Sequence, residues 1–249
     1  MPEFLAMAVD KYNLWENGKV LRVKFLGGTE SIHKQVEMSA KEWENHANIK
    51  FYFVSNGYAH IRVSFDQKIG SQSQVGKAAL SVEGDEPTMN LAITDSTPRA
   101  ELKRQVLHEF GHALGCIHEH CSPRANIQWN FEEVYLHYQK KNGWDRPTVD
   151  RNIFQKYCRE RTKYSKFDPE SIMTYMIPGS HIETGFSVSY NCELSARDKK
   201  FIAKVYPRLG GQRDFSFRIS YAITATVFTI VRIARIARLE PVVGANIRG

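Results

Sequence analysis

The run H-E-F-G-H-A-L-G-C-I-H, which begins at His108, constrains this chain more than any other segment. On a helix, residues four apart lie on one face, so His108 and His112 can bind the same metal ion. Glu109 lies beside that ion, where it can accept a proton from a metal-bound water. Gly115 can take the left-handed conformation that ends a helix. The chain can then turn and bring His118 back as a third ligand.

Three imidazole nitrogens with an adjacent carboxylate are typical of a catalytic zinc site. Zinc prefers tetrahedral coordination with nitrogen at about 2.0–2.1 Å, so three histidines leave one position for water. The alternative is chance, because H-E-x-x-H alone occurs in many chains and most helix histidines are surface or satisfied core residues. The extension of this motif to a third histidine favours a metal site over chance. We therefore expect one catalytic zinc ion per chain.

The flanking residues predict the helix that this motif needs. Thr97 is a candidate N-cap, and Pro98 suits the first helical position, where a missing N–H costs nothing. Apolar residues then recur every four positions and predict a face packed on a core: Leu102, Val106, Phe110 and Leu114. The histidines lie away from that stripe. We expect them to face a cleft.

A second run, S-I-M-T-Y, begins at Ser171. Together with the histidine motif it resembles the metzincin zinc metallopeptidases of the astacin type, over roughly residues 12 to 207. The run is similar to their methionine turn, with Met173 as an apolar floor below the metal and Tyr175 near zinc. Glu119, directly after the third histidine, also matches. So does Leu194-Ser195-Ala196-Arg197-Asp198, which resembles the start of the family's C-terminal helix.

The resemblance implies a zinc metalloendopeptidase that hydrolyses peptide bonds of protein or peptide substrates. A zinc-bound water would attack the carbonyl, with Glu109 as general base and proton donor to the leaving amine. Tyr175 would bind zinc at rest or donate to the oxyanion, and in this family Glu119 pairs with a processed N-terminus. Taken alone, a methionine and a tyrosine would be read as packing residues. The implied metal ligands are His108, His112 and His118, and the supporting residues are Met173, Gly115 and Glu119.

Apolar periodicity predicts the remaining fold. Strand patterns cover residues 20–26, 49–53, 61–65 and 89–93, and a helix pattern covers residues 31–47. Ala78 to Val82 is the expected edge segment that pairs with substrate. The second half has few regular signals before a capping box at Ser195 and Asp198, which begins a helix that ends before Pro207. These patterns suit an α+β, zincin-like fold. It has a mixed twisted sheet with two long helices in the N-terminal half, a loop-rich C-terminal half with a final helix, and an active-site cleft between the halves.

Composition changes near residue 208. We predict a catalytic domain over residues 12–207 and a basic, poorly ordered tail over 208–249. Residues 210–249 hold six arginines against two acidic residues, which accounts for more than half of the chain's net charge of +7. An uncharged run of 13 residues, Ile219 to Val231, is too short to span a membrane as a helix. The following arginines could form a membrane-surface or partner-binding helix. Nothing indicates nucleic-acid binding, and we expect a monomer.

Other features leave alternatives open. Cys116, Cys121, Cys158 and Cys192 are compatible with two disulfides or with none. No signal peptide is visible in the first ten residues, so localisation stays open. His120 and His137 lack a supporting pattern, and we expect both on the surface. Two alternatives to a protease are a catalytically silent zincin-fold binding protein and a membrane- or partner-binding module acting through the tail. The intact Glu109 argues against the first.

Overall fold

The structure is a computed structural model that describes residues 8 to 208 apart from 124, 159, 161, 165 and 166. The predicted tail over 208–249 therefore lies, beyond Arg208 itself, outside the described residues. Within the described part the chain is a mixed α+β structure, as expected.

A five-stranded sheet forms the centre of the N-terminal half, in the order β3-β2-β4-β6-β5. Its strands are β2 (Val20–Phe25), β3 (Lys50–Val54), β4 (Ile61–Ser64), β5 (Gln72–Ser73) and β6 (Met89–Asn90). The first four strands in this order pair in parallel, and β5 pairs antiparallel with β6. The four predicted strands are confirmed, although the last is shorter than expected.

The predicted edge segment is wrong. Ala78 to Val82 does not pair as a strand, because residues Gly76–Ser81 form a 3₁₀ turn instead. Gly76 has φ +51°, and a Cβ there would collide with the carbonyl of Asn13, so the backbone is committed to a tight turn. The edge strand is β5, a few residues earlier, and its two residues gave no period-2 signal.

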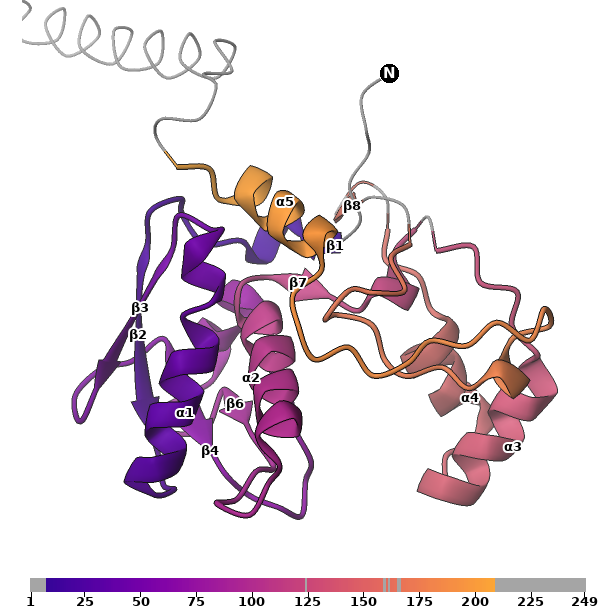
Figure 1. The fold of residues 1–249 in the computed structure, drawn as a ribbon, viewed down its shortest axis with the longest axis horizontal. Coiled ribbons are helices and arrows are strands. Elements are labelled where there is room, and N and C mark those ends of the chain that lie inside the picture. Colours follow the sequence, from indigo (N-terminus) through magenta and orange to yellow (C-terminus); the bar gives the residue numbers. More distant parts are fainter. Residues whose placement is uncertain (1–7, 124, 159, 161, 165–166, 209–249) are drawn as a thin grey trace, which may run out of the picture. The chain divides into compact units, whose positions relative to one another are not determined.

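Two long helices pack side by side against this sheet (Figure 1). They are α1 (Glu30–Ala40), capped by the Thr29 hydroxyl, and α2 (Arg99–Ala113). The helix predicted over residues 31–47 is too long. After Ala40 the chain makes a short 3₁₀ turn that buries Trp43 completely. The Trp43 indole donates to the carbonyl of Leu107, 3.0 Å away, so this turn is fixed by tertiary contact with α2.

The predicted cap of α2 is also wrong. Pro98 is the N-cap residue and makes no side-chain capping bond. The Thr97 hydroxyl instead accepts from the backbone N–H of Thr94, 2.9 Å away, so it is not free to cap the helix. The C-terminal half of α2, residues 106–113, is buried on all sides. That burial follows from its place between the sheet and the second half of the chain.

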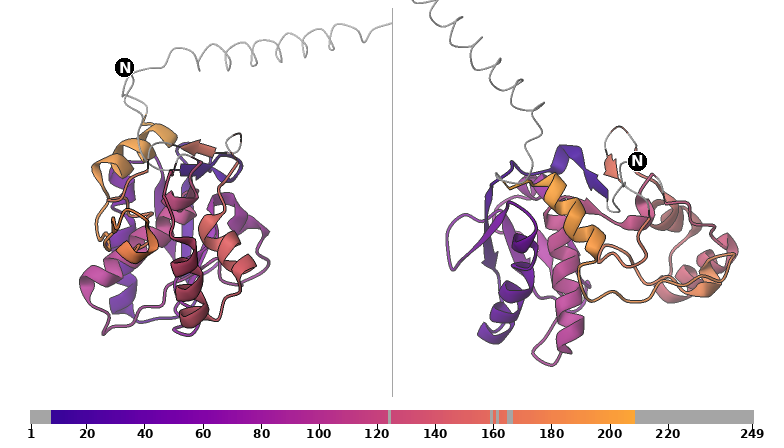
Figure 2. Two further views of the ribbon diagram at one scale, coloured as in Figure 1. Left: turned by 90° about the vertical axis from the view of Figure 1, so that its right-hand side faces the viewer. Right: turned by 45° about the horizontal axis from the view of Figure 1, so that its top comes forward.

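The C-terminal half has an apolar cluster of its own. It is built on α3 (Phe131–Asn142), α4 (Arg146–Val149) and a π-helical turn (Asp150–Phe154). In the right-hand view of Figure 2 the pink ribbons of this half lie on the opposite side from the indigo strands. The prediction treated this region as loops and missed α3. Gly143, at φ +69° directly after α3, was an available signal for a helix end.

A small antiparallel sheet in the order β7-β1-β8 lies beside the start of the final helix. Its strands are β1 (Ala8–Asp10), β7 (Cys116–Ile117) and β8 (Thr162–Tyr164). The final helix, α5 (Ala196–Val205), begins with the predicted capping box at Ser195.

No described helix has both the length and the apolar composition needed to cross a bilayer. All four cysteines are free thiols, so neither of the two possible disulfides is formed.

Candidate metal centre and active-site cleft

The three histidines of the motif converge on one point. His108 and His112 lie one turn apart on α2, and His118 follows β7. The Nε2 atom of His118 lies 3.2 Å from that of His108 and 3.0 Å from that of His112. Tetrahedral coordination at about 2.0–2.1 Å places neighbouring nitrogens about 3.3 Å apart, so this spacing fits one zinc ion.

The opposite ring nitrogens fix which atoms face this point. The Nδ1 atoms of His108 and His112 each lie 2.8 Å from a backbone carbonyl, those of Ile172 and Cys116. A carbonyl only accepts, so both Nδ1 atoms carry the proton and both Nε2 atoms present lone pairs. His118 can donate to only one of them. A cation that accepts all three lone pairs removes this conflict, and the donor set therefore fits zinc.

Burial keeps these imidazoles neutral. It lowers the pKa of His108 to about 3, that of His112 to about 4, and that of His118 well below its usual range. Neutral imidazole is the form that binds a metal. The site can therefore hold a divalent ion across the neutral pH range.

Glu109 lies on the cleft side of the same helix. Its side chain is buried, and its Oε2 atom has no hydrogen-bond partner among the described residues. Burial raises the pKa of this carboxyl to about 8. The desolvated carboxyl therefore holds its proton more strongly than a carboxyl in water does.

The turn after α2 depends on Gly115. Its φ is +95°, and a Cβ there would lie 2.9 Å from the side chain of Leu14. Glycine alone takes this conformation without strain. The prediction that Gly115 ends the helix in the left-handed conformation agrees with the structure.

Two distant aromatic side chains hold the end of α2. The Trp15 indole donates to the carbonyl of Ala113, and the Tyr206 hydroxyl donates to that of Leu114, each over 2.8 Å. Tyr206 also accepts from the backbone N–H of Trp15, 3.2 Å away. These contacts join the turn toward His118 to segments near both ends of the described chain.

Met173 is fully buried. Its sulfur packs against Gly111, where any Cβ would collide with it. Its carbonyl accepts from the backbone N–H of Glu119 over 3.1 Å, which ties the methionine turn to the segment carrying His118. A methionine sulfur is soft and apolar, and the role of Met173 as a floor below the metal stays a prediction.

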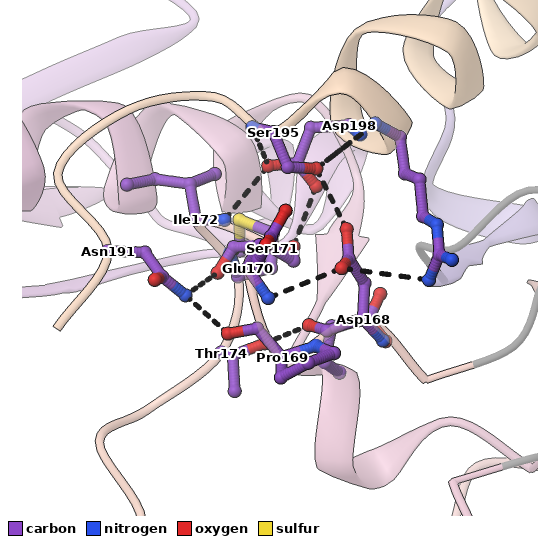
Figure 3. A network of polar contacts seen from close by, with 12 residues as sticks. Asp168, Pro169, Glu170, Ser171, Ile172, Thr174, Asn191, Ser195 and Asp198 are labelled. Atoms are coloured by element: carbon purple, nitrogen blue, oxygen red, sulfur yellow. Dashed lines mark hydrogen bonds and ion pairs between the residues drawn. The ribbon is translucent and has the colours of Figure 1, made fainter. Parts of the chain in front are cut away.

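A polar network holds this turn in place (Figure 3). The carboxylate of Asp198 accepts from the Ser171 hydroxyl at 2.7 Å, from the backbone N–H of Ile172 at 2.8 Å and from that of Ser195 at 2.9 Å. The side-chain amide of Asn191 donates to the carbonyl of Ser171 at 2.9 Å. The first turn of α5 is therefore bonded directly to the loop that carries Met173.

Tyr175 lies across the cluster, 43% exposed. Its ring centroid is 4.2 Å from that of His118 and 5.5 Å from that of His108. Burial also raises the pKa of its phenol, so the hydroxyl keeps its proton.

Glu119 is buried, and burial raises the pKa of its carboxyl to about 8. The predicted pairing of Glu119 with an N-terminus involves residues outside the described part of the chain.

Some of these side chains line a cleft of about 590 Å³. The lining includes β5 and Val75, residues of α3, and the segment after the methionine turn. Of the predicted site residues, Glu109, His112, His118 and Tyr175 line this cleft, whereas His108, Met173, Gly115 and Glu119 do not.

The two histidines expected on the surface are not alike. His137 is half-buried and lines the cleft. His120 is only 2% exposed, so the prediction for it is wrong. Nothing local signals this burial, because it comes from Trp129, Asn152 and Lys156, further along the chain.

His118, His120 and Cys121 form a second group of possible metal ligands, with donor atoms within 4.8 Å of one another. The group shares His118 with the first cluster. The ammonium of Lys156 donates to the carbonyl of His120, so a positive charge lies beside it. The group therefore offers no independent cation site.

Comparisons with known proteins agree with this geometry. Residues 7–218 match the family model for astacin, which describes a family of peptidases. A solved structure of myroilysin is 47% identical, with a TM-score of 0.79 over 81% of this chain and 98% of that one. A crystal structure of myroilysin is 46% identical, with a TM-score of 0.61 over 79% of this chain and 86% of that one.

A more distant similarity concerns the fold alone. High choriolytic enzyme 1, a hatching enzyme zinc-protease of the medaka fish Oryzias latipes, is 18% identical. Its TM-score is 0.53 over 79% of this chain and 95% of that one. The comparison with curated proteins gave no match.

Proposed function

The chain belongs to the astacin family of peptidases and is a zinc-dependent peptidase of proteins or peptides, and on that premise we propose which of its residues perform the reaction. His108, His112 and His118 hold one zinc ion per chain. The observation that carries this assignment is the approach of two Nε2 atoms to that of His118, at 3.2 and 3.0 Å. When bound, zinc supplies a Lewis acid that polarises the scissile carbonyl and lowers the pKa of water.

Glu109 is the general base. It accepts the proton of the attacking water and returns it to the departing amine. Its unpartnered Oε2 atom and its place in the lining of the cleft support this role, because the carboxylate is free to bind a water. Because this glutamate is present in the chain, the proposed base is not missing, which argues against a catalytically silent zincin.

Tyr175 donates a hydrogen bond to the oxyanion. Its exposure to the cleft and its contacts with the rings of His108 and His118 support this role. In other hydrolases, a donor aimed at the developing charge lowers the activation barrier by about 3–4 kcal/mol.

Substrate binds in extended form along β5. Ser71, Gln72 and Ser73 line the cleft, and β5 is the edge of its sheet. Backbone pairing with an edge strand gives affinity with little dependence on sequence. The proposed ligands, base and donor all come from one chain, which supports action as a monomer.

The test is zinc content together with cleavage of casein, an unfolded substrate. The wild type should bind one zinc and cleave. Glu109→Gln should keep the zinc and lose turnover by about a thousandfold or more, and His112→Ala should lose both zinc and cleavage. Full turnover in Glu109→Gln contradicts the proposed base. Zinc binding without any cleavage in the wild type would instead support the silent zincin.

A further inference from the structure

His120 is a buried imidazole that the reaction described above does not use. Its Nε2 atom lies 3.4 Å from the carbonyl of Asn152, and its own carbonyl accepts from Lys156. The edge of Trp129 packs against it, with ring centroids 6.5 Å apart at 88°. The imidazole is therefore held from several sides by residues remote in sequence.

Tyr175, unlike His120, is not held by hydrogen bonds between its side chain and any described residue. Its hydroxyl makes no hydrogen bond with any residue in the described part of the chain, and its ring is 43% exposed. What holds it is contact with three imidazoles. Two of them are the proposed ligands His108 and His118, and the third is His120, with ring centroids 5.6 Å apart.

His120 also supports the third ligand. Its ring stacks on that of His118, with centroids 5.4 Å apart and planes 14° from parallel. The small pocket lined by His120, Trp129 and Tyr175 has a volume of about 10 Å³, about enough for one water molecule. The Tyr175 ring thus lies against the imidazole of His120, with space for about one water molecule beside them.

We propose that His120 is a positioning residue for the reaction. It limits how far the Tyr175 ring can move toward His120, and it affects the reaction only through the position of Tyr175. This rests on the proposed role of Tyr175 as the oxyanion donor. A hydrogen bond weakens steeply as its geometry departs from the optimum, so a displaced phenol stabilises the transition state less. The aromatic face of His120 provides the contact, and its bond to the Asn152 carbonyl fixes the plane of that face.

The test is a double-mutant cycle with Tyr175→Phe. His120→Ala should lower kcat about tenfold, with KM changed less than about twofold and zinc content unchanged. His120→Phe, which keeps an aromatic face, should recover more than half of the loss on a logarithmic scale. In the Tyr175→Phe background, His120→Ala should change kcat less than about twofold.

A matched control is His33→Ala. The His33 imidazole also stacks on an aromatic ring, Phe25, at 4.0 Å, and lies 2.7 Å from a carbonyl, that of Gly27. It is on the surface of the N-terminal half, away from the cleft, so its removal should leave kcat unchanged. A similar loss in this control would mean that any missing stacked histidine lowers activity, and would overturn the proposal.

A second readout does not depend on activity. In metal-free protein labelled with fluorotyrosine, the ¹⁹F resonance of Tyr175, identified by its absence in Tyr175→Phe, should move in His120→Ala and stay in His33→Ala. A resonance that does not move overturns the proposal. So does loss of zinc in both His120 variants, because His120 would then act through His118.

The outcomes separate this proposal from the one on which it rests. If Tyr175→Phe keeps full kcat, the donor role of Tyr175 fails and the positioning role fails with it. If Tyr175→Phe lowers kcat but His120→Ala costs the same in both backgrounds, only the positioning role fails. The roles of the zinc ligands and Glu109 are judged separately, by zinc content and by Glu109→Gln.

Discussion

The hydroxyl of Ser171 donates to a carboxylate oxygen of Asp198 over 2.7 Å, and both residues are completely buried. Ser171 begins the methionine turn, and Asp198 lies in the first turn of α5. The two ends of this bond are 27 residues apart. A capping residue of the last helix thus also holds the floor of the metal site.

Removing that carboxylate should destabilise the whole domain. Asp198→Ala leaves the Ser171 hydroxyl and two backbone N–H groups buried without an acceptor, and we expect a loss of about 3 kcal/mol in the free energy of unfolding. Urea unfolding measures it. Asp85→Ala is the control, because that carboxylate is exposed and pairs only with Lys24. Equal losses in both variants would contradict a special role for Asp198.

The same residue predicts a pH dependence. Burial raises the pKa of Asp198 to about 6, above its ordinary 3.8, although its hydrogen bonds oppose the shift. A raised folded-state pKa means that this group's contribution is complete below pH 4 and is lost as the pH rises through 6. The loss is about 3 kcal/mol. Relative to Asp198→Asn, the wild type should therefore lose unfolding free energy between pH 4 and 7, and parallel pH profiles would refute this.

Gly111 should not tolerate a methyl group. A Cβ there would collide with the sulfur of Met173 and lie 3.1 Å from the Trp43 ring. We expect Gly111→Ala to cost about 1–3 kcal/mol in stability, despite the better helix propensity of alanine. It should also lower zinc affinity, because the floor of the site must move. Gly27→Ala, where a Cβ meets nothing within 4 Å, is the thermal-unfolding control.

Zinc removal should lower stability reversibly. Without a cation, the lone pairs of His108 and His112 both face the third histidine and cannot both be satisfied. At free zinc one hundred times the dissociation constant, binding adds about 2.7 kcal/mol. Thermal unfolding with a chelator, and then with zinc restored, measures the change. His112→Ala should show no response to either addition, and a response there would place the zinc elsewhere.

Tyr175→Phe should lower kcat by about tenfold to a hundredfold, less than a fully buried oxyanion donor would. Stability should change little, because the hydroxyl makes no hydrogen bond with a described residue. Steady-state kinetics on a quenched peptide separates kcat from KM. Tyr52→Phe, exposed on β3, is the control. Unchanged kcat in Tyr175→Phe would reduce this residue to a packing role.

The local parts of the site could be predicted from the sequence. The spacing of His108, Glu109 and His112 follows from helix geometry, and the turn at Gly115 follows from the freedom of glycine. The start of α5 was also predictable, because a capping box is a local pattern. Met173 and Tyr175 have no local signal, and family resemblance alone pointed to them.

Features made by distant segments could not be predicted. His120 is buried by residues that follow it by nine to 36 positions, and no local pattern reports this. The edge strand β5 has two residues, too few for any periodicity, and it forms because β6 pairs with it. The helix predicted to residue 47 ends at Ala40, because burial of Trp43 against α2 outweighs local helix propensity.

The bonds from Trp15 and Tyr206 to the end of α2 have a consequence for synthesis of this enzyme. A ribosome exposes the histidine motif long before it exposes residue 206. Until then the carbonyl of Leu114 lacks its donor, and α5 cannot hold Ser171. A chain that stops before α5 therefore lacks the contacts that hold the turn toward His118 and the methionine turn.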